Sequence, residues 1–120
     1  MTNTEKDLVD VLKYHIAVDQ SGTRIYRNAA GQFHREEGPA VITAQGAVFW
    51  YQCGELHRVG GPAVIYSDGT EEWWQNGQLH RVGGPAITFV DCTVGLYIQG
   101  QRYSEDEYRI KVAELASRAL

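Results

Sequence analysis

The middle of the chain alternates short apolar runs with turn residues, a pattern typical of β-hairpins. Three β-rich runs are each followed by a two-residue turn and then by a second apolar run, usually aromatic. In chain order these segments are 41–43, Gln45-Gly46 and 49–51; 64–66, Asp68-Gly69 and 73–74; and 87–89, Asp91-Cys92 and 96–98. Asp-Gly and Asn-Gly between such runs favour type I′ turns, which need positive φ at both residues. The pattern predicts a mainly β chain whose hairpins join into one antiparallel meander.

The hairpins recur with a fixed period. His34, His57 and His80 lie 23 residues apart, and each begins a His-Arg-x-x-Gly-Pro-Ala motif. The motif residues expected to maintain the repeat are His34, Arg35, Gly38, Pro39, His57, Arg58, Gly61, Pro62, His80, Arg81, Gly84 and Pro85. A fixed period of this length indicates a repeat architecture. Residues 34–102 therefore divide into three repeats, after a degenerate half-repeat at 16–33 with one residue inserted in its 28–31 turn.

The Gly-Pro step is expected to redirect the chain once in every repeat. Proline donates no backbone hydrogen bond and belongs at a strand start or a bulge, and the glycine before it permits a sharp backbone bend. The last repeat has Cys92 where the others have a turn glycine. We therefore expect a different turn type in that repeat.

An amphipathic helix is predicted over residues 4–15, with Thr4 as its N-cap. Its expected apolar face consists of Leu8, Val11, Leu12 and His15. This face needs a partner, and the open first edge of the sheet is the nearest one. The helix is thus expected to cap the N-terminal end of the array.

A second helix is predicted to cap the C-terminal end within residues 104–119. Ser104 and Glu107 form a capping-box pattern, and the acidic first turn suits a helix N-terminus. The expected apolar face of this helix consists of Tyr108, Val112, Leu115 and Ala119. With both helices, residues 1–120 are predicted to form a single domain.

Residues 19–102 resemble the MORN family of β-hairpin repeats. The likeness rests on Gly77-Gln78-Leu79-His80, on the Asp68-Gly69 turn and on an aromatic residue near the following glycine. It is nearer to a variant in uncharacterised bacterial and phage proteins that has the His-Arg-x-x-Gly-Pro-Ala core and a capping helix. Arg58 and Pro62 stand where standard MORN repeats tend to be rich in glycine. The resemblance implies an interaction module without shared catalytic residues.

Charge and composition narrow the class of partner. The net charge is −4 and the sequence pI is about 5.5. These values argue against a basic patch for phosphate backbones, so no direct nucleic-acid binding is expected. The polar N-terminus lacks a signal-peptide core and no run reaches membrane-spanning length, which predicts a cytoplasmic protein without a membrane partner. In that compartment Cys53 and Cys92 are expected to be free thiols.

The repeated His-Arg pairs raise two alternatives, a metal or phosphate site and a structural role. Equivalent residues in successive repeats lie two strands apart, or about 10 Å, whereas zinc needs each imidazole nitrogen at about 2 Å. Three histidines in a row therefore cannot share one ion, and neither a metal nor a cofactor is expected. The structural alternative is that His and Arg bind loop carbonyls or acidic neighbours such as Glu71 and Glu72.

The aromatic residues of the predicted strands are the candidate partner-binding set. They are Trp50, Tyr51, Tyr66, Trp73, Trp74 and Tyr97. Adjacent strand residues point to opposite faces, so Trp73 and Trp74 cannot share one. An exposed apolar patch on a small protein commonly marks an interface. The alternative is that the helices or self-association cover both faces.

These observations predict a non-enzymatic protein–protein interaction module of bacterial or phage origin that binds a protein through its aromatic sheet face. Homodimerisation through the same face is a second mode that the pattern allows. One alternative is a phage-encoded inhibitor that sterically blocks a host defence complex, as anti-CRISPR proteins do, in the host cytoplasm. Another is a self-assembling structural protein. An enzyme is not expected, because Cys53 lies in a turn without a basic helix end and no glycine loop precedes a helix to hold phosphate.

Overall fold

The computed structural model describes residues 9–119 and consists mainly of antiparallel β-sheet with a C-terminal helix, as predicted. The largest sheet has nine strands in the order β1-β2-β3-β4-β7-β8-β11-β12-β13. These strands are β1 (His15–Val18), β2 (Arg24–Arg27), β3 (Val41–Ile42), β4 (Val48–Phe49), β7 (Val64–Ile65), β8 (Glu71–Glu72), β11 (Ile87–Thr88), β12 (Val94–Ile98) and β13 (Gln101–Tyr103). Two small hairpins pair β5 (Tyr51–Gln52) with β6 (Glu55–Leu56), and β9 (Trp74–Gln75) with β10 (Gln78–Leu79).

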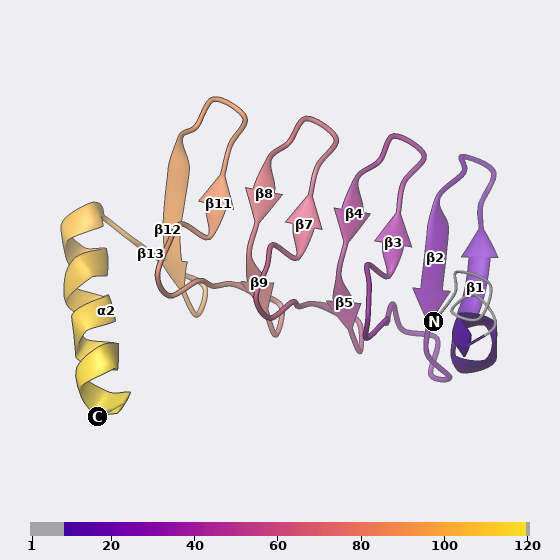
Figure 1. The fold of residues 1–120 in the computed structure, drawn as a ribbon, viewed down its shortest axis with the longest axis horizontal. Coiled ribbons are helices and arrows are strands. Elements are labelled where there is room, and N and C mark those ends of the chain that lie inside the picture. The colour runs from indigo at the N-terminus through magenta and orange to yellow at the C-terminus, as the bar shows by residue number, and fades with distance from the viewer. Residues whose placement is uncertain (1–8, 120) are drawn as a thin grey trace.

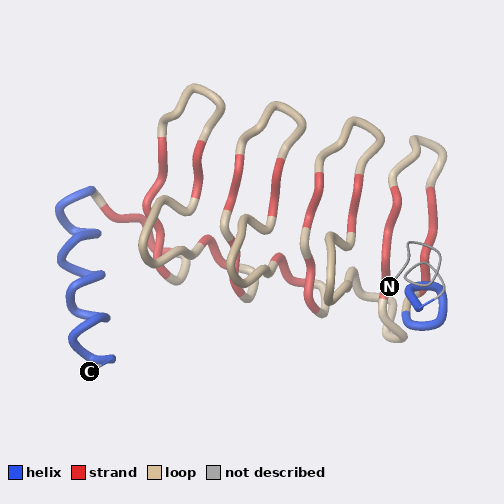
Figure 2. Tube along the Cα trace, in the orientation of Figure 1, coloured by secondary structure: helices blue, strands red, loops and turns tan. Residues whose placement is uncertain are grey.

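The sheet is a single layer with a helix at each end (Figures 1 and 2). Helix α2 (Glu105–Ala119) stands beyond β12, and the N-terminal helix, described over residues 9–13, lies below β1. Neither helix covers a broad face of the sheet. Directly opposed residues form a row across the middle strands, and that row is Val41, Phe49, Val64, Glu72, Ile87 and Gly95. Within this row Val64 is fully buried, and Val41, Phe49, Glu72 and Ile87 are half-buried.

The upper hairpin turns in Figure 1 differ from the predicted type I′ turns. Tyr66 N–H donates to Thr70 O at 2.9 Å, and Gly69 N–H donates to Tyr66 O at 2.9 Å. The loop therefore has three residues, 67–69, and positive φ is confined to Gly69 at +95°. This is the hairpin geometry in which a type I turn is followed by one left-handed residue. The Asp-Gly signal located the hairpin correctly but assigned the wrong turn type.

The expectation of a different turn at Cys92 was also wrong. Phe89 N–H donates to Thr93 O and Cys92 N–H to Phe89 O, both at 2.9 Å, which is the bonding seen around Gly69. Cys92 adopts a φ of +70°, so it occupies the left-handed position that glycine takes in the other repeats. The flanking strand pairs impose the turn, and Cys92 is held in a strained backbone conformation because it carries a Cβ atom.

Cys92→Gly is accordingly expected to raise the free energy of unfolding by about 1 kcal/mol, because glycine adopts the left-handed conformation without steric cost. The reverse substitution in the equivalent turn, Gly69→Cys, should lower it by a similar amount. Urea unfolding of both variants measures the effect. If neither substitution moved the unfolding midpoint, Cys92 would not be strained.

The lower turns in Figure 1 are the two-residue type that the sequence predicts. Both residues have positive φ in Asn76-Gly77 (51° and 76°), in Cys53-Gly54 (48° and 83°) and in Gln99-Gly100 (51° and 82°). The first of the lower turns carries the extra residue, because Asn28 N–H donates to Gln32 O at 3.0 Å and encloses a three-residue loop. Both cysteines are free and exposed, as expected.

The predicted apolar face of the N-terminal helix was wrong. Of its expected members, Val11 and Leu12 are 65% and 88% exposed, and His15 belongs to β1 rather than to the helix. Asp10 and Tyr14 are the buried residues instead. Their side chains form hydrogen bonds with Arg35 and with Glu36 N–H. A pattern of apolar residues does not predict such polar contacts. The predicted cap Thr4 and the predicted face residue Leu8 lie outside the described residues.

Helix α2 follows the prediction closely. Glu107 N–H donates to Ser104 Oγ at 3.2 Å, and Ser104 N–H donates to Glu107 Oε1 at 3.1 Å, which completes the capping box. Of the predicted apolar face, Tyr108 is buried and Val112 and Leu115 are half-buried, whereas the side chain of Ala119 is outside the described set. No helix among residues 9–119 is long and apolar enough to span a membrane.

Candidate protein-binding surface

Each His-Arg motif places its guanidinium over an aromatic ring. The Arg Cζ atom lies 4.0 Å from the ring centroid in Arg35–Tyr26, 3.9 Å in Arg58–Trp50 and 3.8 Å in Arg81–Trp73. Such cation–π stacks contribute about 0.5–2 kcal/mol each, more where water is excluded. They also hold the planar guanidinium in one orientation. The sequence pattern did not identify this pairing, although an aromatic residue lies eight positions before Arg58 and Arg81 and nine before Arg35.

The glycine and the proline of each motif both contact the arginine of the same motif. Arg58 Nη1 donates to Pro62 O at 3.0 Å, and the equivalent bonds of Arg35 and Arg81 to their prolines are 3.3 and 3.2 Å. A Cβ atom on Gly61 would lie 2.8 Å from Arg58 Cζ. The expected role of this glycine in a sharp bend is therefore corrected: it makes room for the guanidinium. The left-handed residue is the preceding one in the last two motifs, as at Gly60 with φ +83°.

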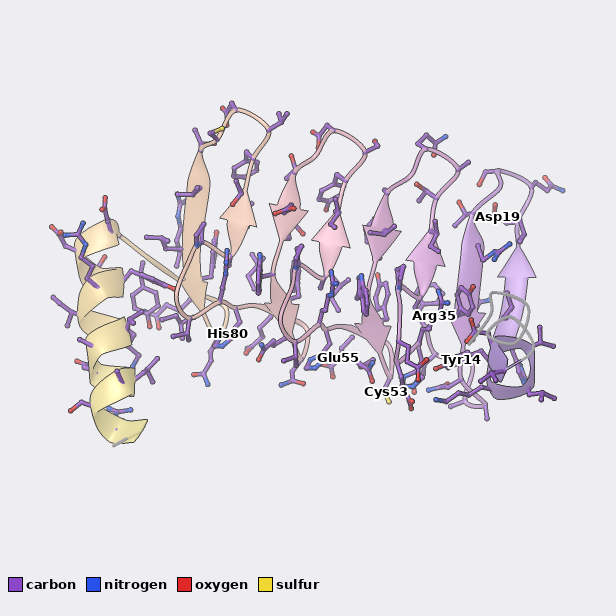
Figure 3. The ribbon with its side chains drawn as sticks, in the orientation of Figure 1. Tyr14, Asp19, Arg35, Cys53, Glu55 and His80 are labelled. Carbon is purple, nitrogen blue, oxygen red and sulfur yellow. The ribbon has the colours of Figure 1, made fainter. Side chains whose placement is uncertain are left out.

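The three histidines fix the lower turns of the following unit. His34, His57 and His80 accept through Nδ1 the backbone N–H groups of Cys53, Asn76 and Gln99, at 2.9, 3.0 and 2.9 Å. Figure 3 shows His80 and Cys53 at the lower edge of the molecule. The histidines thus accept bonds from amides rather than donating to carbonyls as expected. No bond joins a motif His or Arg to Glu71 or Glu72 among the described residues, and Glu72 instead accepts Trp74 Nε1–H at 2.9 Å.

A metal site finds no counterpart in the described part of the chain, where no group of three His, Cys, Asp or Glu residues could hold an ion. His57→Ala should instead lower the free energy of unfolding by about 1 kcal/mol, because Asn76 N–H loses its acceptor at an exposed turn. Thermal unfolding with and without a chelator measures this effect. A chelator-dependent midpoint in the unsubstituted protein would contradict the structural role.

The six aromatic residues predicted for partner binding do not form one continuous face. Trp50 and Trp73 lie beneath arginines. Tyr51 packs edge-on against Phe33 at 5.2 Å between centroids, and Trp74 bonds to Glu72. Tyr97 is half-buried, with its ring 2.9 Å from where a Cβ of Gly95 would be. Tyr66 is the exposed member, at 38%.

Part of the exposed apolar surface lies near the upper hairpin tips of the last two units, and we name Tyr66, Phe89 and Val90 the tip patch. Phe89 and Val90 are 45% and 65% exposed. Tyr66 and Phe89 each follow a strand, β7 and β11, and these strands flank β8. The Tyr66 ring also packs edge-on against Phe49 at 6.0 Å. The 23-residue offset between Tyr66 and Phe89 is the signal that the sequence analysis did not use.

Charges beside the tip patch are acidic. The Asp68 carboxylate accepts Thr70 N–H at 2.8 Å, and this bond lowers the pKa of Asp68. The Asp91 pKa is lowered in the same way by Thr93, whose hydroxyl donates at 2.6 Å. Partial burial and the nearby Glu72 carboxylate raise the pKa of Tyr66. The tip patch is therefore apolar at its centre and anionic at its rim.

Comparison of the chain with protein-family models, with curated proteins and with solved structures finds no match in any of the three.

Proposed function

We propose that this chain is a non-enzymatic protein-binding module that holds a protein partner against the tip patch of its sheet. The observation that carries the proposal is the exposure of Tyr66, Phe89 and Val90 on a single-layer sheet with no covering helix among the described residues. Apolar groups gathered on one exposed surface are typical of an interface. The anionic rim formed by Asp68 and Asp91 favours a partner surface with basic residues around an apolar centre.

The proposal includes a repeat array with capping ends. Three features support it: the Arg–aromatic stack, the Arg–Pro bond and the His–amide bond each recur at 23-residue intervals. The two helices stand at opposite ends of the sheet, where they protect edges that would otherwise pair with other chains. A cytoplasmic location is part of the same proposal and agrees with two free, exposed cysteines. The MORN likeness stays a prediction.

Site-specific photocrosslinking tests the interface. A benzoylphenylalanine residue is placed at Tyr66 or at Phe89, and the control carries it at Arg109, whose side chain is 70% exposed on α2. In bacterial lysate we expect one discrete heterologous adduct from both tip positions and none from the control. The same adducts from all three positions, or none from the tip positions, would refute the interface. An adduct of twice the chain mass would assign the tip patch to self-association.

A further inference from the structure

The three motif loops, residues 34–38, 57–61 and 80–84, have the same internal stack but different outside contacts. The first loop is held by the N-terminal helix. Asp10 Oδ2 accepts a hydrogen bond from Arg35 Nη2 at 2.9 Å, and Tyr14 Oη accepts Glu36 N–H at 3.1 Å. Arg35 and Tyr14 lie near one another at the N-terminal end of the sheet (Figure 3). One helical turn thus supplies a carboxylate and a hydroxyl to one loop.

The third loop is held by α2 from the opposite end. Tyr108 Oη accepts the N–H groups of Gly83 and Gly84 at 3.0 and 3.2 Å, and it lies 2.7 Å from Arg81 O and 2.9 Å from Gly84 O. A tyrosine hydroxyl on a helix therefore satisfies the backbone of this loop as well. The chain itself therefore covers the first and the third motif loop with side chains from its terminal helices.

The second loop has neither contact. Within residues 9–119, the Arg58 guanidinium bonds to Pro62 O but to no carboxylate, and Val59 N–H has no acceptor. An open pocket of about 350 Å³ adjoins these groups, lined by Glu36, Trp50, Gln52, His57, Arg58 and Val59. Val59 is 76% exposed where the first loop has Glu36. The pocket thus presents a fixed guanidinium, a free amide and an apolar side chain.

We propose that this pocket binds a carboxylate side chain carried on a helix of a protein partner. Arg58 takes the role toward that carboxylate that Arg35 has toward Asp10, and Val59 N–H binds a hydroxyl one helical turn away, as Glu36 N–H binds Tyr14. The stack on Trp50 and the bond to Pro62 hold the guanidinium in place, so binding costs little side-chain entropy.

A single carboxylate fits the pocket better than a phosphate group. The Glu36 carboxylate lines the pocket wall and is bound by Lys13 Nζ at 2.6 Å. Because these two charges cancel, Arg58 leaves one net positive charge at the pocket. A dianion would meet repulsion from Glu36 and from the acidic chain as a whole, whose net charge is −4. The exposed Val59 side chain adds an apolar contact that a helix surface supplies and a free anion does not.

Nuclear magnetic resonance of the ¹⁵N-labelled protein tests the proposal. The probe is an alanine-based helical peptide of about 16 residues that carries Asp and Tyr four positions apart, and the matched control peptide carries Asn for Asp. We expect saturable shifts of the Arg58 Nε–H, Trp50 indole and Val59 amide signals, with about tenfold weaker binding of the Asn peptide. Arg35 signals should stay in place because Asp10 already occupies that guanidinium.

Arg58→Lys keeps the charge and removes the planar fork, so it should also weaken binding of the Asp peptide by about tenfold. The amide spectrum of this variant reports whether it is folded. Equal affinity for both peptides, unmoved Arg58 and Trp50 signals at millimolar peptide, or larger shifts with inorganic phosphate than with peptide would each overturn the proposal. The site uses none of Tyr66, Phe89 and Val90, so its failure is separate from that of the crosslinking experiment.

Discussion

Asp10→Asn is expected to lower the free energy of unfolding by about 3 kcal/mol. Asp10 and Arg35 are 7% and 8% exposed and are joined at 2.9 Å. Removing one partner of a buried ion pair costs about 3–5 kcal/mol, because the other charge stays buried without compensation. Within residues 9–119, Arg35 Nε already lacks a hydrogen-bond partner. Urea unfolding followed by tryptophan fluorescence measures the loss.

The matched control is Glu36→Gln, which removes a carboxylate from the exposed Lys13–Glu36 pair. That pair has side chains 41% and 51% exposed, and exposed pairs contribute at most about 1 kcal/mol. A loss at Asp10 no larger than the loss at Glu36 would mean that the N-terminal helix does not hold the first loop. The first-loop contact would then be no template for the pocket at Arg58.

Gly61→Ala should cost about 2 kcal/mol, although it adds only one methyl group and φ at this position is not left-handed. The new Cβ would lie 2.8 Å from Arg58 Cζ and 3.0 Å from Nε, so the guanidinium must leave the Trp50 ring and the Pro62 carbonyl. Overpacking of this kind typically costs about 1–3 kcal/mol. Chemical denaturation measures the cost, and quenched or shifted fluorescence of Trp50 reports the displaced guanidinium.

A double-mutant cycle assigns that cost to its cause. In an Arg58→Ala background the clash is gone, so Gly61→Ala should there change the free energy of unfolding by less than about 0.5 kcal/mol. The same cost in both backgrounds would show that the glycine is required by the backbone rather than by the arginine. Because the Gly–Arg approach recurs at 2.9, 2.8 and 2.7 Å, the result applies to all three motifs.

The features that the sequence could predict depend on local backbone chemistry. Asn76-Gly77 specifies its turn because both residues adopt positive φ at low cost, and Ser104 with Glu107 specifies the start of α2 through two reciprocal bonds. The β-rich runs locate the hairpins for the same reason. Each of these signals lies within a few residues of the structure it determines.

The features that it could not predict depend on contacts between segments. Cys92 adopts a left-handed turn because the flanking strands hold it there, and propensity alone favours glycine. The buried face of the N-terminal helix is set by Asp10 and Tyr14 through Arg35 and Glu36, more than twenty positions away. The Arg58–Trp50 stack covers a ring that the sequence predicted to bind a partner. The 23-residue period predicted a structural role for the arginine but did not identify the aromatic ring that it contacts.

The lower turns have a further consequence, because the backbone bond from the glycine of each turn runs the same way along the chain. Gly54, Gly77 and Gly100 each donate an N–H to the unit before, to Phe33 O, Leu56 O and Leu79 O at 2.9, 3.0 and 2.9 Å. A duplicate of 57–79 inserted after Leu79 would meet the same acceptor on one side and offer the same acceptor on the other. Each added copy would move α2 about 10 Å further from the N-terminal helix. In a repeat array of this kind the number of units would set the distance between the two helices.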